Sequence, residues 1–470
     1  MNNSDLISVF RKLSKKDIRN LRNFVNSPFF NQREDVIQLF EFIAENIEVS
    51  ATLLKKEKVY AVLFPNTKYE DAKIRYAMSF LLKNIKKYLA YTAMENDGVQ
   101  EQLYLAKALQ QLEHEKLFNK EWEVARKKLD VQPIRNEYYF FDQYLLFNQK
   151  YEFVSKETRS VNMPLGKTIE HLSIFYFAKI LKQGCLVLAQ KKFSSNDFDL
   201  TITDAVVRQL KERLDNLPPV VQIYYHSYLC MRDLEQEKHF TAFKQLMSEH
   251  GSLIPKKELR DLYLIGVNYA INQANNGKKN YIKELFELCK SGLEKDVFLQ
   301  NGHLSHFLFK NVLVAGLAIG EKDWVKSFLI KYKEVLYPKN RKNFFQYCMA
   351  NFYYQTQEYD KAMPILQQVE FHDILHNLGA RKMLLCIYYE RNEIEPLYSL
   401  LDSFSVFIRR RKKELGYHSE YFSNLIHYVK RLLKIDLTNK KKRERLKEEI
   451  VGVQRIVEKA WLLRQIENGS

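Results

Sequence analysis

Turn-forming residues are scarce in this chain, which has 14 glycines and 10 prolines among 470 residues. Together they make up about 5% of the sequence, against roughly 12% in average proteins. Sheets need a turn every few residues, and turns rely on glycine and proline, so this scarcity predicts an all-α chain. It also argues against dinucleotide-binding, phosphate-loop and barrel enzymes, whose folds need glycine-built turns. A sheet of four or more strands would contradict the prediction.

The chain carries a basic excess, with 74 lysines and arginines against 57 acidic residues and a formal net charge of +17. This excess permits contact with nucleic acid, an anionic membrane surface or an acidic protein, but net charge alone does not choose among them. Lysines on solvated helix faces are the plainer interpretation. Hydrophobic residues make up 46% of the chain, which excludes global disorder.

The cysteines, the N-terminus and the apolar runs predict a cytoplasmic chain without a transmembrane segment. The cysteines are widely spaced, odd in number and set in apolar stretches, so we interpret them as buried hydrophobic residues in a reducing compartment. They are Cys185, Cys230, Cys289, Cys348 and Cys386. The first residues lack the apolar region of a signal peptide. The longest candidate span, Phe307 to Ile319, contains Lys310 and is too short to cross a bilayer.

Polar breaks along the chain predict three parts. Residues 1–92 are expected to form an N-terminal helical domain, residues 99–435 an array of helical hairpins, and residues 436–470 a C-terminal capping helix. A flexible seam is expected near residues 155–167. Within the first part, Ser14 followed by Asp17 resembles a capping box, which predicts that a helix begins there.

The long helix expected from about Glu70 to Tyr91 separates an apolar face from a basic face at 100° per residue. From Ala72 to Met94 it has five basic residues and no acidic one. They are Lys73, Arg75, Lys83, Lys86 and Lys87. This face is a candidate surface for a polyanion, and a merely solvated face is the alternative.

Residues Val59 to Leu89 include Leu63-Phe64-Pro65-Asn66 followed by this amphipathic helix. The stretch resembles the helical part of winged-helix domains in some bacterial transcriptional activators. The resemblance covers only this short segment, and no pair of strands that could form a wing follows Tyr91.

A second concentration of basic charge lies near the C-terminus. The run consists of Arg409, Arg410, Arg411, Lys412 and Lys413, and only Glu414 stands beside it. A polybasic run can attract phosphates by charge alone, so these residues are candidates for polyanion binding. The alternative is a solvated helix end, where cations complement the helix dipole.

The clearest internal repeat lies within residues 311–401. Its best copy is Gln346-x-x-Met349-Ala350-x-x-Tyr353, followed by Tyr359-x-x-Ala362-x-x-x-Leu366. A shift of 35 residues places Leu385 and Leu397 at the two small positions downstream, and Ala315 and Ser327 upstream. The pattern resembles the tetratricopeptide repeat, a helical hairpin of about 34 residues. The two leucines depart from the small residues of that repeat.

The resemblance implies an α-solenoid of stacked hairpins, with an inner groove lined mainly by the first helix of each hairpin. Members of that family generally hold an extended peptide or a partner helix in the groove, and they seldom perform chemistry. The alternative is an irregular helical array without this relationship.

Two histidine pairs have spacings that could hold a metal. His372 and His376 lie four residues apart, with Asp373 where a zinc protease has glutamate, but no third ligand is evident. His303 and His306 are a weaker pair. We predict no metal site from either pair.

No catalytic or cofactor-binding constellation is evident. Gly166-Lys167-Thr168 ends like a phosphate loop, but Val161 stands where the loop needs glycine. The leading hypothesis is therefore a non-enzymatic scaffold that binds a protein or peptide in the solenoid groove. The alternative is a nucleic-acid-binding or transcription-regulatory protein that uses the two basic surfaces. The oligomeric state stays open.

Overall fold

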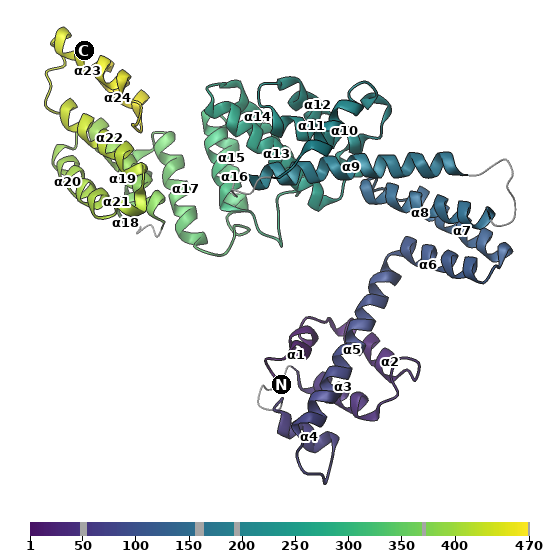
Figure 1. The fold of residues 1–470 in the computed structure, drawn as a ribbon. Coiled ribbons are helices and arrows are strands. Elements are labelled where there is room, and N and C mark those ends of the chain that lie inside the picture. The colour runs from purple at the N-terminus through teal and green to yellow at the C-terminus, as the bar shows by residue number, and fades with distance from the viewer. Residues whose placement is uncertain (48–53, 156–163, 192–197, 369–372, 469–470) are drawn as a thin grey trace. The chain divides into compact units, whose positions relative to one another are not determined.

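The computed structural model describes residues 1–47, 54–155, 164–191, 198–368 and 373–468 (Figure 1). In these residues the secondary structure consists of helices and two isolated β-bridges, with no strand, so the all-α prediction is confirmed. The helices are α1 (Asp5–Phe10), α2 (Lys15–Asn26), α3 (Glu34–Asn46), α4 (Lys56–Leu63), α5 (Asp71–Asn96), α6 (Gly98–Gln111), α7 (Glu115–Asp130), α8 (Glu137–Val154), α9 (Leu165–Lys191), α10 (Thr201–Leu210), η1 (Leu214–Asn216), α11 (Pro219–Arg232), α12 (Glu237–His250), η2 (Gly251–Leu253), α13 (Lys256–Asn275), α14 (Asn280–Glu294), α15 (His306–Ala318), α16 (Lys322–Tyr332), α17 (Arg341–Gln355), α18 (Tyr359–Gln368), α19 (Ile374–Glu390), α20 (Ile394–Arg410), α21 (Lys412–Leu415), α22 (His418–Leu432), α23 (Lys440–Gly452) and α24 (Lys459–Asn468).

The chain forms two compact units. Unit 1 comprises residues 1–183 and 201–221, and unit 2 comprises residues 184–200 and 222–470. The division passes through α9 and α11, so each of these helices contributes residues to both units.

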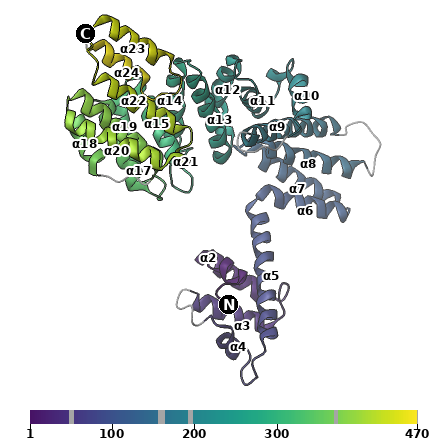
Figure 2. The ribbon, with the colours of Figure 1, turned by 60° about the vertical axis from the view of Figure 1, so that its left-hand side comes forward.

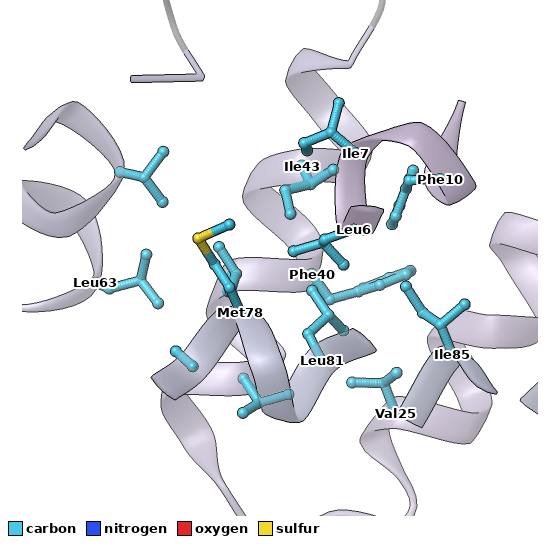
Figure 3. Close-up of a cluster of buried hydrophobic side chains, with 14 of the residues drawn as sticks. Leu6, Ile7, Phe10, Val25, Phe40, Ile43, Leu63, Met78, Leu81 and Ile85 are labelled. Carbon is cyan, nitrogen blue, oxygen red and sulfur yellow. The ribbon is translucent and has the colours of Figure 1, made fainter. Parts of the chain in front are cut away.

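Helices α1 to α5 enclose the first hydrophobic core of unit 1 (Figure 3). Leu6 and Phe10 of α1, Phe40 of α3, and Leu81 and Ile85 of α5 are buried in it. The predicted capping box begins α2: the backbone N–H of Asp17 donates to Ser14 Oγ at 3.1 Å, and the N–H of Ser14 donates to Asp17 Oδ2 at 3.0 Å. The cap satisfies helix N–H groups that otherwise lack partners.

Helices α6, α7 and α8 share a second core in unit 1. Phe118 and Phe153 stack with ring centroids 4.2 Å apart, and Trp122 Nε1 donates to the carbonyl of Leu146 at 2.8 Å. This hydrogen bond lets the indole lie in the core without an unpaired N–H group.

A buried glutamate joins α8 to α9 within unit 1. The Glu137 side chain is fully buried, and its Oε1 accepts from Lys182 Nζ at 2.8 Å and from Lys179 Nζ at 3.4 Å. Lys179 Nζ also donates to the hydroxyl of Tyr138 at 2.9 Å. A buried carboxylate is tolerated only when it is paired and hydrogen-bonded. The two lysines meet this need at Oε1, whereas Oε2 has no hydrogen-bond partner among the described residues.

Helix α9 is the longest apolar helix in the part of the chain that the structure describes, so the expectation that Phe307 to Ile319 is the longest membrane-span candidate is wrong. Its length, and a mean hydropathy of 1.5 over an 18-residue window, would suffice to cross a bilayer. Core helices of globular proteins pass the same test, so one such helix is weak evidence for a span. Lys179 and Lys182 also interrupt its apolar sequence and pair with Glu137.

Unit 2 contains a solenoid of helical hairpins, as the sequence predicts. Helix α13 pairs with α14, α15 with α16, α17 with α18, and α19 with α20. Neighbouring hairpins pack through α14 on α15, α15 on α17 and α17 on α19. At the end of the chain, α22 packs on α20 and α24 packs on α22 and α23 (Figures 1 and 2).

The hairpins share one turn, in which a residue with positive φ follows the first helix. In the α17–α18 turn this residue is Gln357, whose N–H donates to the carbonyl of Tyr354, while the N–H of Glu358 donates to that of Tyr353. These two bonds are a Schellman motif. The same pair of bonds surrounds the positive-φ residues of four other hairpins in the described chain, namely Glu113, Gly277, Gly320 and Asn392.

The shared turn corrects the predicted register of one repeat. Ala362 lies five residues after Gln357 and is buried, and so is Leu397 after Asn392. The same step from Gly320 leads to Val325, which is buried, whereas Ser327 is exposed. The upstream assignments of Ala315 and Ser327 were therefore both wrong by two residues, and Leu313 and Val325 occupy these positions. The error arose because a uniform shift of 35 residues ignores a spacing of 37 between Gly320 and Gln357.

Candidate functional site

Helix α15 of the solenoid has exposed apolar side chains on the side away from its packed neighbours. Helix α15 buries Leu308, Phe309, Val312, Leu313, Ala315 and Gly316 against its neighbours. Its opposite side has Phe307 and Val314, whose surfaces are 54% and 51% exposed, together with the exposed Lys310 and Ala318. Spacings of three and four residues place these four residues, here called the α15 face, in one stripe along the helix.

Lys310 is the charged member of the α15 face. It forms no ion pair within the described residues. A cation flanked by exposed apolar side chains can bind a partner that offers both a carboxylate and an apolar surface.

A pocket of about 900 Å³ lies at the N-terminal end of α15 and is lined there by Ser305, His306 and Leu308. Arg260 and Lys339 provide its positive charge, and none of its described lining residues is acidic. His303 and His306 both line the pocket, where His303 packs on Tyr337 and His306 on Phe344. His303 Nδ1 and His306 Nε2 have no hydrogen-bond partner among the described residues. Burial lowers the pKa of His306, which favours the neutral ring at neutral pH. The positive charge of this pocket, like that of Lys310, favours an acidic partner.

The chain's own C-terminal helix binds the corresponding side of α19. Lys382 of α19 forms an ion pair with Glu458, which lies directly before α24. Trp461 Nε1 donates to Glu390 Oε1 at 2.6 Å, and the indole meets the ring of Tyr389 edge-on at 5.3 Å. Residues of the C-terminal segment thus contact Lys382 and Glu390 of α19, whereas Gly379 of the same helix lies against Tyr347 of α17.

The predicted basic residues of α5 lie on an exposed face of unit 1. Lys73 pairs with Glu70 at 3.5 Å, and Arg75 with Asp71 at 2.7 Å. The other three predicted residues are exposed and form no ion pair within the described part of the chain; they are Lys83, Lys86 and Lys87.

Aromatic rings lie among the lysines of α5. Tyr76 is exposed and Phe80 half-buried, and helical spacing places both on the side of Lys83 and Lys87. The guanidinium of Arg33 lies over both rings, 4.9 Å from the centroid of Tyr76 and 4.4 Å from that of Phe80. Cations beside aromatic rings are a common feature of surfaces that bind single-stranded nucleic acids.

The second predicted basic surface belongs to unit 2. Arg409 and Arg410 end α20, Arg411 follows, and Lys412 and Lys413 begin α21; all five are exposed. Arg411 pairs with Glu414 at 3.1 Å. Arg409 and Lys412 also line a pocket of about 540 Å³ that includes three serines and Glu420, and Glu420 is itself paired with Arg455 at 2.8 Å.

The predicted absence of a metal site stays a prediction. His372 lies outside the described residues, and among those described no group of three or more His, Cys, Asp or Glu side chains could hold a metal. His376 instead stacks on Tyr347 with ring centroids 4.4 Å apart. Asp373 caps α19, because its Oδ1 accepts from the N–H groups of Leu375 and His376. A helix cap explains this aspartate without a catalytic role.

Burial shifts the pKa of several titratable groups in the described interior. The five cysteines are free and buried, as predicted, and burial raises the pKa of the Cys230, Cys289 and Cys386 thiols to about 12. Thiols of this kind are poor nucleophiles at neutral pH. Burial and the nearby Asp97 raise the pKa of Asp142 to about 6, against a hydrogen bond from Gln100.

The phosphate-loop-like segment has an ordinary structural role. Val161 lies outside the described residues, and Lys167, in the first turn of α9, pairs with Glu170 at 2.9 Å.

Comparison with family models, curated proteins and solved structures gave no match to this chain. The resemblances to tetratricopeptide repeats and to winged-helix domains therefore stay predictions that rest on the residues quoted for them.

Proposed function

We propose that the protein is a non-enzymatic interaction scaffold that binds a helical segment of a partner protein on the α15 face. The observation that carries the proposal is the pair of half-exposed apolar side chains, Phe307 and Val314, on the first helix of a packed hairpin. Exposed apolar surface of this kind commonly marks a protein-binding site. The contacts of Glu458 and Trp461 with Lys382 and Glu390 support a helical segment as the occupant, because these two residues of α19 correspond to Lys310 and Ala318.

Site-specific photo-crosslinking tests this function in the full chain. A photoreactive phenylalanine analogue at Val314 should crosslink one partner in cells, and the crosslinked peptide should come from a helical, acidic segment. Phe307→Asp should remove that crosslink without unfolding the protein, because Phe307 is already half-exposed. The control is the same analogue at Ile330 of α16, which is also exposed but lies outside the α15 face. Identical crosslinks from both positions, or none from Val314, would contradict the proposal.

A second function, nucleic-acid binding through α5, is favoured by the unpaired Lys83, Lys86 and Lys87 beside aromatic rings. Replacing the three lysines by glutamate should abolish binding to DNA or RNA at about 50 mM salt, where non-specific contacts are strong. Each phosphate contact that is lost should lower the slope of log K against log salt by about one for duplex DNA.

The matched control is the same change at three exposed lysines of α23. Lys440, Lys441 and Lys442 form no ion pair within the described residues, and their replacement by glutamate changes the net charge equally. Binding should survive this control. Equal losses in both variants would mean that only the overall charge matters, and no binding by the unaltered protein would eliminate this second function.

A further inference from the structure

The shared hairpin turn allows α15 and α19 to be compared position by position. Lys382 lies ten residues before the positive-φ residue Asn392, and Lys310 lies ten residues before Gly320. The two lysines therefore occupy the same place on their hairpins. The corresponding residue of α17 is Tyr347, whose ring is stacked on His376 and buried. Of these three helices, only α15 has an uncovered side chain at this position.

The residues that contact α19 show which side chains can bind beside Lys382. Lys382 takes the carboxylate of Glu458, and Trp461, three residues later, lies against Tyr389 and Glu390 near the end of α19. The indole is 1% exposed, so the contact is fully desolvated. A carboxylate followed three residues later by a large side chain thus fits this face.

The α15 face differs from α19 at the position of Glu390, which accepts the hydrogen bond from the indole N–H on α19. Glu390 lies two residues before Asn392, and the residue two before Gly320 is Ala318. Val314 likewise corresponds to Cys386. A tryptophan on α15 would therefore leave its N–H unpaired once buried, and an unpaired buried donor is costly. The α15 face favours a side chain without a polar atom.

We propose that the partner segment, on the function proposed above, carries a carboxylate for Lys310 and, three residues later, phenylalanine, leucine or methionine rather than tryptophan. Lys310 pairs with the carboxylate, and Leu317 and Ala318, which correspond to Tyr389 and Glu390, contact the apolar side chain. Arg260 and Lys339 of the adjoining pocket favour further acidic residues at the end of the segment nearest to them.

A peptide of this chain's own sequence is the probe. Residues 453–468 with the change Trp461→Phe, labelled with a fluorophore, are titrated with the full-length protein and followed by anisotropy. Lys310→Glu should weaken binding at least about tenfold, the effect of losing one charge-assisted pair. The peptide that also has Glu458→Lys should recover binding to the Lys310→Glu protein. Lys322→Glu, at an exposed position of α16, is the control and should leave binding unchanged.

The preference against tryptophan has its own test. The peptide that retains Trp461 should bind the unaltered protein about five- to tenfold more weakly than the Trp461→Phe peptide, and Ala318→Glu should reverse this order by supplying an acceptor. No binding below about 1 mM, or binding unaffected by Lys310→Glu, would overturn the inference. Crosslinking from Val314 to a partner segment that lacks the carboxylate would overturn it too, while leaving the proposed function intact.

Discussion

Replacing Trp461 by alanine is expected to lower the free energy of unfolding of unit 2 by about 3–5 kcal/mol, the usual cost of truncating a buried aromatic side chain. The indole is among the largest fully buried side chains of the described chain. Its loss leaves a cavity against Tyr389 and removes the hydrogen bond to Glu390. Urea unfolding followed by circular dichroism measures the loss.

The same change should loosen α24 locally. Hydrogen exchange of residues 459–468 and of the end of α19 should accelerate, because Glu458 and Trp461 hold this segment to α19. Trp461→Phe is the control: it keeps a buried aromatic ring but removes the indole N–H and part of the buried volume, so it should cost about 1–2 kcal/mol, less than the alanine variant. An alanine variant as stable as the phenylalanine variant would show that the ring does not anchor α24.

The fold class could be predicted because it depends on local rules. The sequence shows the scarcity of glycine and proline, the Ser14–Asp17 capping box and the small residues Ala350 and Ala362. The structure buries both alanines. The register between repeats was harder to predict, because the left-handed turn residue is glycine at Gly320 but glutamine at Gln357. A glutamine in the sequence does not indicate a positive φ, and the spacing between these turns changes along the chain.

A hairpin upstream of the quoted repeats has the same turn, also at a residue other than glycine. Helices α6 and α7 meet at the positive-φ residue Glu113, and Ala106 lies seven residues before it, as Ala350 lies before Gln357. Both alanines are fully buried.

The α15 face could not be predicted from the apolar run Phe307 to Ile319. That run has apolar residues on all sides, so periodicity does not show which of them neighbouring helices cover. The packing of α14, α16 and α17 leaves Phe307 and Val314 outside. The basic residues of α5 were predictable because charged side chains stay in solvent wherever the helix packs.

The burial of Glu137 likewise could not be predicted from the sequence. Its replacement is expected to cause the second large loss in the free energy of unfolding. Sequence periodicity places it at the start of a helix, where glutamates are usually exposed, yet it is fully buried and paired with lysines 42 and 45 residues away. Glu137→Gln should destabilise unit 1 by about 3–5 kcal/mol, because Lys179 and Lys182 would keep two half-buried positive charges without a counter-charge.

The comparison that isolates this charge uses an exposed glutamate of the same helix. Glu152→Gln should change the free energy of unfolding by less than about 0.5 kcal/mol, since Glu152 lies near the end of α8 in contact with solvent. Adding Lys182→Met to Glu137→Gln should restore part of the stability, because one uncompensated cation is removed and its apolar stem is kept. Urea unfolding of the four proteins gives the values. If Glu137→Gln were no more damaging than Glu152→Gln, the two lysines would have to reach solvent without the carboxylate, and the α8–α9 contact would rest on apolar packing alone.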